Sequence, residues 1–265
     1  MKRLLRTWSR DLAGACRLFA ARRTDPAAVA GLITELRPVA GGRELIRLGP
    51  PGDGGYLVPD DLEGIGSCFS PGVDRECRFE LDCAARGMRV FMADASVAGP
   101  PVAEASFAFL PKYLGAVADE TTMTLDEWVA GSDAPAGDML LQMDIEGHEY
   151  ATLLATSPAL LDRFRILVIE FHDLVQLFNR PFFGLARSTF RKLLRHHACV
   201  HLHPNNCCGQ ETIAGIAIPR VMEFTFLRRD RIVPGAAAWR SPHALDRDNA
   251  ARPPLPLPRL WHPAG

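Results

Sequence analysis

Ionisable residues gather just after several apolar runs of this 265-residue chain. The run 139–143 leads directly into Asp144-Ile145-Glu146-Gly147-His148-Glu149, and the run 165–171 carries Glu170 near its end. A carboxylate inside a buried run needs a partner, and crowded carboxylates repel one another. Either histidines take up protons there, or a divalent cation sits among the oxygens. The residues that we expect to share one crevice are Asp144, Glu146, His148, Glu170, His172 and His203.

Strands and helices that alternate along the chain must position these residues. This alternation predicts an α/β fold with a doubly wound, mainly parallel sheet, in which ligands bind outside the carboxyl ends of the strands. We expect the strands before Asp144, His172 and His203 to lie side by side. Two final strands, 213–218 and 221–227, are expected to form a hairpin around Pro219-Arg220. The other predicted strands are 65–69, 89–93, 139–143, 165–171 and 199–203, and the predicted helices are 75–86, 126–130, 149–161 and 185–197.

Two turns could approach a nucleotide. Gly72, in Ser70-Pro71-Gly72, lets the backbone come close to a ligand, and the following helix N-terminus offers free N–H groups. Asp94 follows about 22 residues later, near the spacing at which an acidic residue takes ribose hydroxyls. A structural alternative stays open, because Asp94 could cap the next segment and the acids of 144–149 could favour a helix start.

The segment MLLQMDIEGHEYATL, residues 139–153, resembles the signature of the FkbM-type family of S-adenosylmethionine-dependent methyltransferases. TTMTLDEWV, RILVIEFH and GDGGYLVP resemble further segments of that family, in the same order, so the resemblance covers roughly residues 45 to 230. The chain departs from the family at two places: its first loop is reduced to Ser70-Pro71-Gly72, and Asp94-Ala95 stands in place of a Glu-Pro pair.

The resemblance implies a Rossmann-like methyltransferase fold and S-adenosylmethionine as cofactor. The cofactor would lie along Ser70 to Gly72 with its ribose on Asp94, and its methionine end would approach Asp53, Gly55 and Asp144. A hydroxyl acceptor must lose its proton, which calls for a general base or a metal. The residues expected to be catalytic are Asp144, Glu146, His148 and His172, with His203 a further candidate base, and those expected to hold Mg or Mn are Asp144, Glu170 and His172.

The composition is that of an ordinary globular protein, with 48% hydrophobic and 23% charged residues. The net charge of -1 gives no reason to expect nucleic acid as a partner. Seven cysteines without a C-x-x-C pair predict reduced thiols in a cytoplasmic protein. We interpret Cys207-Cys208 as two partly buried thiols, with a redox or metal role as the alternative.

Three regions are expected: a helical extension over 1–40, a methyltransferase domain over 41–233 and a Pro/Ala/Arg-rich tail over 234–265. Residues 1–23 form a basic amphipathic pattern, which favours packing on the domain or on a second subunit. Peripheral contact with an anionic membrane is the alternative. The tail is expected to be loosely packed, extended polyproline. The oligomeric state is not indicated.

We therefore predict an EC 2.1.1 methyltransferase that modifies a hydroxyl on a small molecule or glycan. A metal-dependent hydrolase that uses the acidic and histidine-bearing strand ends is one alternative. A non-catalytic binding module, supported by the reduced first loop, is another. A nicotinamide-dependent oxidoreductase would need a Gly-rich fingerprint, which the sequence lacks.

Overall fold

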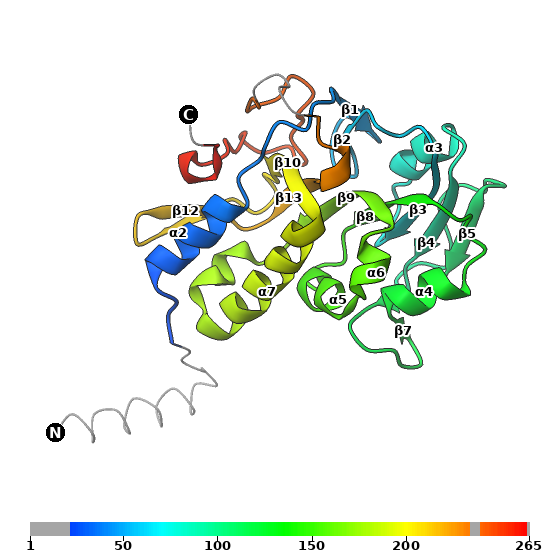
Figure 1. Cartoon of the computed structure of the whole chain (residues 1–265), viewed down its shortest axis with the longest axis horizontal. Helices are drawn as coiled ribbons and strands as arrows, with labels where there is room; N and C mark the ends of the chain where they lie inside the picture. The colour runs from blue at the N-terminus through cyan, green and yellow to red at the C-terminus, as the bar shows by residue number, and fades with distance from the viewer. Residues whose placement is uncertain (1–21, 234–238, 264–265) are drawn as a thin grey trace.

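A seven-stranded sheet forms the centre of the molecule (Figure 1). The computed structural model describes residues 22–233 and 239–263. The strand order is β10-β13-β9-β8-β3-β4-β5, and β13 runs antiparallel to both of its neighbours. The predicted mainly parallel α/β sheet is therefore confirmed. Its strands are β3 (Ile65–Pro71), β4 (Arg89–Ala93), β5 (Phe107–Leu110), β8 (Asp138–Met143), β9 (Phe164–Phe171), β10 (His197–Pro204) and β13 (Met222–Arg228).

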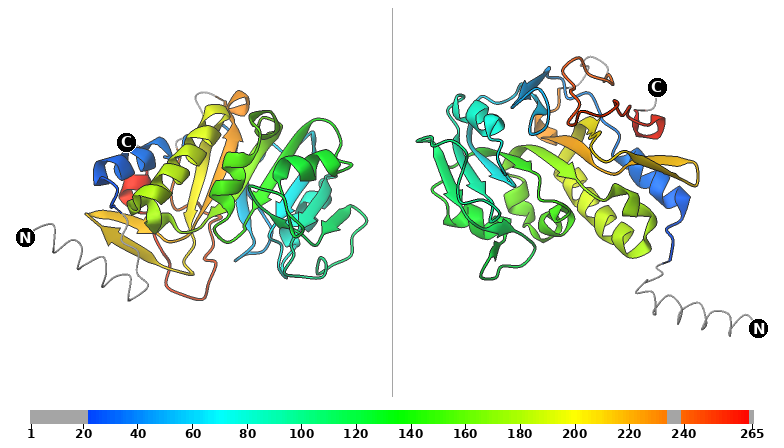
Figure 2. Two further views of the ribbon diagram at one scale, coloured as in Figure 1. Left: turned by 90° about the horizontal axis from the view of Figure 1, so that it is seen from below. Right: turned by 180° about the vertical axis from the view of Figure 1, so that it is seen from behind.

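Both faces of the sheet are covered, as expected of a doubly wound fold (Figure 2). Alternate residues of each strand feed two cores. Leu141 and Leu167 pack in the core under α2 and α4–α7, while Leu140 and Val168 pack in the core with α3, β1 and β2. The covering elements are α2 (Pro26–Glu35), α3 (Arg78–Ala84), α4 (Leu125–Gly131), α5 (Glu149–Ala155), α6 (Pro158–Leu161) and α7 (Arg180–His196), with β1 (Leu45–Leu48) paired to β2 (Tyr56–Pro59).

The strand order reverses beside β3. From β3 the chain moves outward to β4 and β5 on one side, and it returns to place β8 and β9 on the other side. The turns after β3 and β8 consequently leave the sheet next to each other. Such a switch point is where an open α/β sheet offers a crevice to ligands.

The end of the predicted topology is wrong in two respects. β13 lies between β9 and β10, so the strand that carries His203 is not a neighbour of the strand before His172. The hairpin joins β11 (Gln210–Ile213) to β12 (Ile216–Pro219) and turns at Ala214-Gly215, both of which have left-handed backbones, with φ of 53° and 79°. This hairpin forms a separate two-stranded sheet, as do β6 (Tyr113–Leu114) and β7 (Thr122–Met123).

One predicted helix is two. The segment 149–161 divides into α5 and α6 because Ser157 accepts a hydrogen bond from the N–H of Leu160 and Pro158 opens the new helix. Proline is well placed at the first position of a helix, where its missing N–H costs no hydrogen bond.

The C-terminal segment 239–263 is packed against the domain. Trp261 is fully buried and Leu257 joins it in the larger core. The side chain of Asn206 accepts from the N–H of Ala250 and donates to the carbonyls of Ala250 and Arg252. The expected loose packing is therefore wrong for these residues, while the domain boundaries at 40 and 233 stay a prediction.

The N-terminal extension is described from Arg22 onward. Helix α2 begins at Pro26, where Asp25 caps it and accepts from the N–H of Ala27. Val29 and Ile33 bury this helix against the domain. The amphipathic pattern of residues 1–21 lies outside the described residues.

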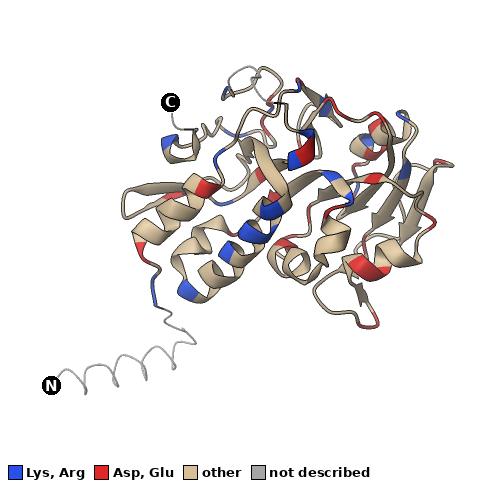
Figure 3. Cartoon of the chain, in the orientation of Figure 1, with Lys and Arg blue, Asp and Glu red and all other residues tan. Residues whose placement is uncertain are grey.

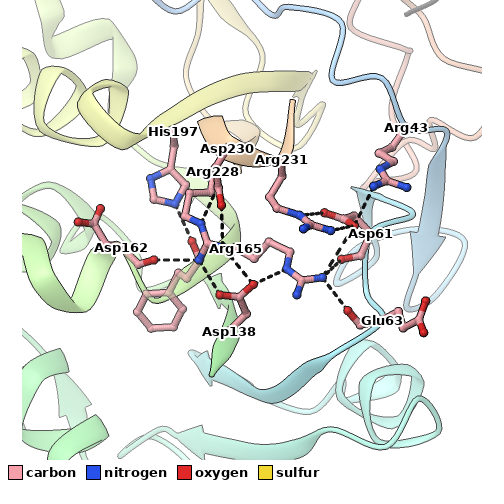
Figure 4. A network of polar contacts seen from close by, with 11 residues as sticks. Arg43, Asp61, Glu63, Asp138, Asp162, Arg165, His197, Arg228, Asp230 and Arg231 are labelled. Atoms are coloured by element: carbon pink, nitrogen blue, oxygen red, sulfur yellow. Dashed lines mark hydrogen bonds and ion pairs between the residues drawn. The ribbon is translucent and has the colours of Figure 1, made fainter. Parts of the chain in front are cut away.

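A network of ion pairs lies at the end of the sheet where the parallel strands begin, opposite their carboxyl ends (Figure 4). Asp138 opens β8 and accepts from Arg165 of β9 at 2.7 Å and from Arg228 of β13 at 2.6 Å. Arg165 also lies 3.8 Å from Asp61, which pairs with Arg231 at 2.6 Å. These charges stand at the start of the parallel strands, away from the crevice, so we assign them to stability and not to chemistry.

Candidate active site

Polar residues line up across the carboxyl edge of the sheet. Glu223 of β13 stands in register between His203 of β10 and Glu170 of β9. Asp144 follows β8 directly, one position beyond the last registered pair of β8 and β9. The expected convergence of strand-end residues is thus present, with Glu223 inserted into the row.

The turn after β3 touches the turn after β8. Gly72 has a left-handed backbone with φ +85°, and a Cβ at this position would lie 1.6 Å from the carbonyl oxygen of Asp144. The N–H of Asp144 donates to Pro71 at 3.3 Å, and the N–H of Gly72 donates to Ala93 at 3.0 Å. Only glycine permits this approach, so Gly72 brings the predicted cofactor turn against the acidic turn that begins at Asp144.

A cavity of about 570 Å³ opens at these turns. A smaller cavity of about 230 Å³ adjoins it and shares four of its lining residues, Asp53, Gly72, Asp74 and Asp144. The larger cavity is lined on its charged side by carboxylates and one histidine: Asp53, Asp74, Asp94, Asp144, Glu146 and His148.

Asp94 is fixed at the wall of the larger cavity. One carboxylate oxygen accepts from the N–H of Asp74 at 3.1 Å, and the other accepts from the N–H and hydroxyl of Ser96 at 2.7 and 2.6 Å. Burial raises the pKa of Asp94, but these hydrogen bonds outweigh it and hold the pKa below its ordinary value. Asp94 therefore presents an oriented, ionised acceptor.

The remaining predicted cofactor residues differ in position. Asp53 lines both cavities. The Ser70 side chain is fully buried, contacts Glu80 and donates to Gln142 at 2.6 Å, so it lies behind two residues that line the smaller cavity and lines neither cavity itself. Gly55 packs against Pro50 and is absent from both linings. A cofactor role for these three residues stays a prediction.

His172 is the centre of an acidic cluster between β8 and β9. Its Nε2 atom lies 3.5 Å from Glu146 and 3.8 Å from Asp144, and its Nδ1 atom lies 3.1 Å from Glu149. Glu170 is 3.9 Å from Nε2. Four carboxylates thus surround one imidazole, three of them on residues predicted to act together with His172.

Glu149 builds the turn that presents this cluster. Its Oε1 atom accepts from the N–H groups of Ile145 and Gly147, at 3.2 and 3.0 Å, as well as from His172. Positive φ angles of 54° at Glu146 and 99° at Gly147 allow the chain to fold back around it. The side chain of Glu149 is fully buried, so it is held in place by the turn that it organises.

Three oxygens of the cluster have no hydrogen-bond partner although they are buried: Asp144 Oδ1, Glu149 Oε2 and Glu170 Oε2. Ligand atoms of Asp144, Glu149 and His172 all lie within 4.8 Å of one another. Ligands on opposite sides of a magnesium ion are about 4 Å apart, so a small adjustment would bring these atoms around one cation. Glu149 occupies the place that the sequence assigned to Glu170, which is nearby but outside this set.

The Methyltransferase FkbM domain family matches residues 91–196, a range that includes Asp94, Asp144 and His172. The chain carries an FkbM methyltransferase domain. The predicted family resemblance is confirmed, and the domain implies an enzyme of class EC 2.1.1 that uses S-adenosylmethionine.

Solved methyltransferase structures are more distant. The 23S rRNA methyltransferase ErmE is 10% identical with a TM-score of 0.32, and the similarity covers 78% of this chain and 70% of that one. The mitomycin 7-O-methyltransferase MmcR is 11% identical with a TM-score of 0.23, covering 63% of this chain and 50% of that one. No curated protein matches the chain.

The acidic lining of the two cavities suits the cationic groups of the methyl donor. S-adenosylmethionine carries a sulfonium and an ammonium group, which suit the carboxylates at Asp53, Asp74 and Asp144. Asp94 would take the ribose hydroxyls, as carboxylates do at the second strand of nucleotide-binding units.

Burial or neighbouring charges raise the pKa values of three residues in this cluster. Burial works against protonation of His172, but Glu149, Asp144 and Glu146 together raise its pKa to about 9. Burial raises the pKa of Asp144 to about 7, against the opposing charge of His172. Burial and the charge of Asp144 raise the pKa of Glu170 well above its ordinary value. The site therefore holds protons that a bound cation would displace.

Some functional positions were placed differently from the sequence expectation. His148 lines the larger cavity, whereas His203 lies one strand beyond Glu223, 3.8 Å from Asp246. Sequence reasoning missed Glu149 as a cluster member, because acids at a helix start are common. It also missed Glu223, although a carboxylate inside the apolar run MEFTFL was the same signal that singled out Glu170.

Proposed function

We propose that the FkbM domain methylates a hydroxyl group on a small molecule or glycan. The observation that carries this proposal is the His172 cluster, which adjoins the cavity that Asp94 also lines. A hydroxyl needs to lose its proton during methyl transfer, and a cluster of carboxylates and imidazole is suited to accept or displace it. The net charge of -1 and the acidic lining speak for an uncharged or cationic acceptor and against nucleic acid.

The donor supplies an electrophilic methyl group when bound. Asp94 would hold its ribose, and Asp53 and Asp144 would face its cationic end. The backbone contact between Gly72 and Asp144 fixes the distance between the donor side and the cluster. Positioning of the two reactants accounts for much of the acceleration that such a site can provide.

The proposal includes a divalent cation held by Asp144, Glu149 and His172. Two observations support it: the ligand atoms lie within 4.8 Å of one another, and three buried oxygens of the cluster lack partners. A cation would lower the pKa of a bound hydroxyl. The carboxylate oxygens suit magnesium, and the added imidazole would permit manganese or zinc, with water completing the shell.

Without a cation, the chain's own groups would move the proton. Because the neighbouring carboxylates raise the pKa of His172 to about 9, an acceptor proton would pass to Asp144 or Glu146. This histidine-assisted version uses the same geometry and predicts activity that survives chelation.

Calorimetry with S-adenosylhomocysteine tests the donor half of the proposal. Asp94→Ala should weaken binding by about 1–3 kcal/mol, the scale of lost hydrogen bonds to a charged group. Asp60→Ala removes an exposed carboxylate at the end of β2 and serves as the matched control. Equal affinity in wild type and Asp94→Ala would place the ribose elsewhere.

Methyl transfer to a panel of hydroxylated small molecules and glycans, with and without chelator, tests the acceptor half. Transfer that stops on chelation and returns with Mn²⁺ supports the cation version. Donor binding without transfer to any acceptor would favour a non-catalytic module. Hydrolysis of panel members that is independent of the donor would favour a metal-dependent hydrolase.

The compartment is also a proposal. Cys68, Cys77, Cys83 and Cys199 are free and buried, which is compatible with the cytoplasm. Cys207 and Cys208 form a disulfide between neighbours, so the expectation that these two thiols are reduced is wrong. No helix in the described ranges is long and apolar enough to cross a bilayer.

A further inference from the structure

Basic residues recur along helix α7 on the outside of the domain (Figure 3). Its 17 residues, RPFFGLARSTFRKLLRH, contain no acidic side chain. Positions separated by seven, four and four residues fall on one side of a helix, so the row is straight and about 22 Å long. We call this row the α7 stripe; it consists of Arg180, Arg187, Arg191 and Arg195, all exposed.

The fold neutralises little of this charge. Arg191 pairs with Glu35 of α2 at 2.6 Å, on the surface. In residues 22–233 and 239–263, no ion pair involves Arg187 or Arg195. Lys192 adds another cation, whose Nζ atom donates to the carbonyls of Leu153 and Leu154 at the end of α5. The stripe is therefore a solvated positive surface, and packing of the domain does not account for its charge.

The basic N-terminus of the chain joins the domain at the start of the same helix. The carbonyl of Arg22 accepts from the N–H of Arg180, and Arg23 forms a β-bridge with Asn179. Residues 1–21 lie ahead of this junction. They combine basic residues (Lys2, Arg3, Arg6, Arg10 and Arg17) with apolar ones at helical spacing (Leu4, Leu5, Trp8, Leu12 and Phe19) and contain one acidic residue, Asp11.

We propose that the α7 stripe and residues 1–23 together bind an anionic lipid surface. A straight, exposed row of arginines can contact a planar surface of negative lipid headgroups along its whole length. The apolar residues of the N-terminus would insert at the headgroup boundary, which a polynucleotide does not offer. A single basic element binds a membrane only weakly, whereas two connected elements bind with a higher effective concentration. This surface goes beyond the proposed methyl transfer and does not depend on it.

Vesicle sedimentation with the full chain tests the proposal. We expect binding to vesicles of phosphatidylcholine with phosphatidylglycerol, weaker binding at high salt and little binding to phosphatidylcholine alone. The double variant Arg187→Gln/Arg195→Gln should bind at least about tenfold more weakly, because each arginine near an anionic surface contributes about 1 kcal/mol. The variant Leu5→Ser/Trp8→Ser should also bind more weakly if the N-terminus inserts.

The control is Arg78→Gln/Arg86→Gln, which removes two exposed arginines, one at the start of α3 and one just after its end, with the same change in net charge. Unchanged thermal unfolding of the α7 variant would show that the loss of binding is not a loss of fold. Equal losses in the α3 control, or equal binding to both vesicle types, would overturn the proposal. Displacement of the protein from vesicles by a stoichiometric amount of duplex RNA would also overturn it, in favour of a nucleic-acid surface.

Discussion

The substitution Glu149→Gln separates the electrostatic role of Glu149 from its structural one. Glutamine keeps the shape of the side chain and an oxygen that accepts from Ile145, Gly147 and His172, but it carries no charge. In the native protein the hydrogen bond and charge of Glu149 are the largest of the influences that raise the pKa of His172 to about 9. The turn should therefore survive the substitution while the imidazole loses its main anionic partner.

We expect the pKa of His172 in Glu149→Gln to fall by about one or more, equivalent to about 1.4 kcal/mol of lost interaction. Asp144→Asn is the comparison: Asp144 lies 3.8 Å from the imidazole and Glu149 lies 3.1 Å from it, so Asp144→Asn should lower the pKa less. Imidazole nitrogen NMR across a pH titration of chelator-treated protein measures both values.

The same change has a signature in stability. A folded-state pKa above the unfolded value near 6.5 stabilises the protein below pH 6.5, and this stabilisation is lost as the pH rises toward 9. The difference in unfolding free energy between wild type and Glu149→Gln should shrink over that window. An unchanged His172 titration in Glu149→Gln, or a larger fall in Asp144→Asn, would refute the assignment of Glu149 as the principal partner.

Three further outcomes follow from burial and backbone geometry. Burial lowers the pKa of His197 to about 4, so stability present above pH 6.5 should fall by about 3 kcal/mol as the pH drops toward 4; urea unfolding at several pH values checks this, and His197→Gln should flatten the curve. Trp261→Ala should destabilise the domain by about 3–5 kcal/mol in urea unfolding, and a loss below about 1 kcal/mol would contradict its place in the core. Gly72→Ala should abolish folding or donor binding, whereas Gly87→Ala, with a similar φ of 84° but open space around it, should cost only about 1–2 kcal/mol; similar stability of the two variants would refute the close approach.

The parallel core of the fold could be predicted from sequence because its signals are local. Apolar runs at 65–69, 89–93, 139–143 and 165–171 became β3, β4, β8 and β9 with small changes at their ends. β5 was missed because Phe107–Leu110 is a short edge strand and its residues are mostly half-buried. The insertion of β13 between β9 and β10 is a pairing between distant segments, which no local pattern encodes.

The candidate site was predictable to the extent that strand ends converge. Asp144, Glu146, Glu170 and His172 come together because β8 and β9 are parallel neighbours, which their apolar runs indicated. His203 does not join them because its strand is one position further away. The orientation of individual side chains was beyond the sequence: Ser70 turns inward, and Glu149 turns back under its own loop.

The place of β13 and Trp261 has a consequence for how the protein is made. A ribosome releases the chain from the N-terminus, and domains generally fold as units in that direction. Here β9 and β10 leave the ribosome before β13, the strand that must separate them, and the larger core lacks Trp261 until still later. A nascent chain therefore exposes the apolar edge of β9 throughout the synthesis of the segment from Phe171 to Met222. We expect a premature stop after β12 to yield a species prone to aggregation, not a smaller folded domain.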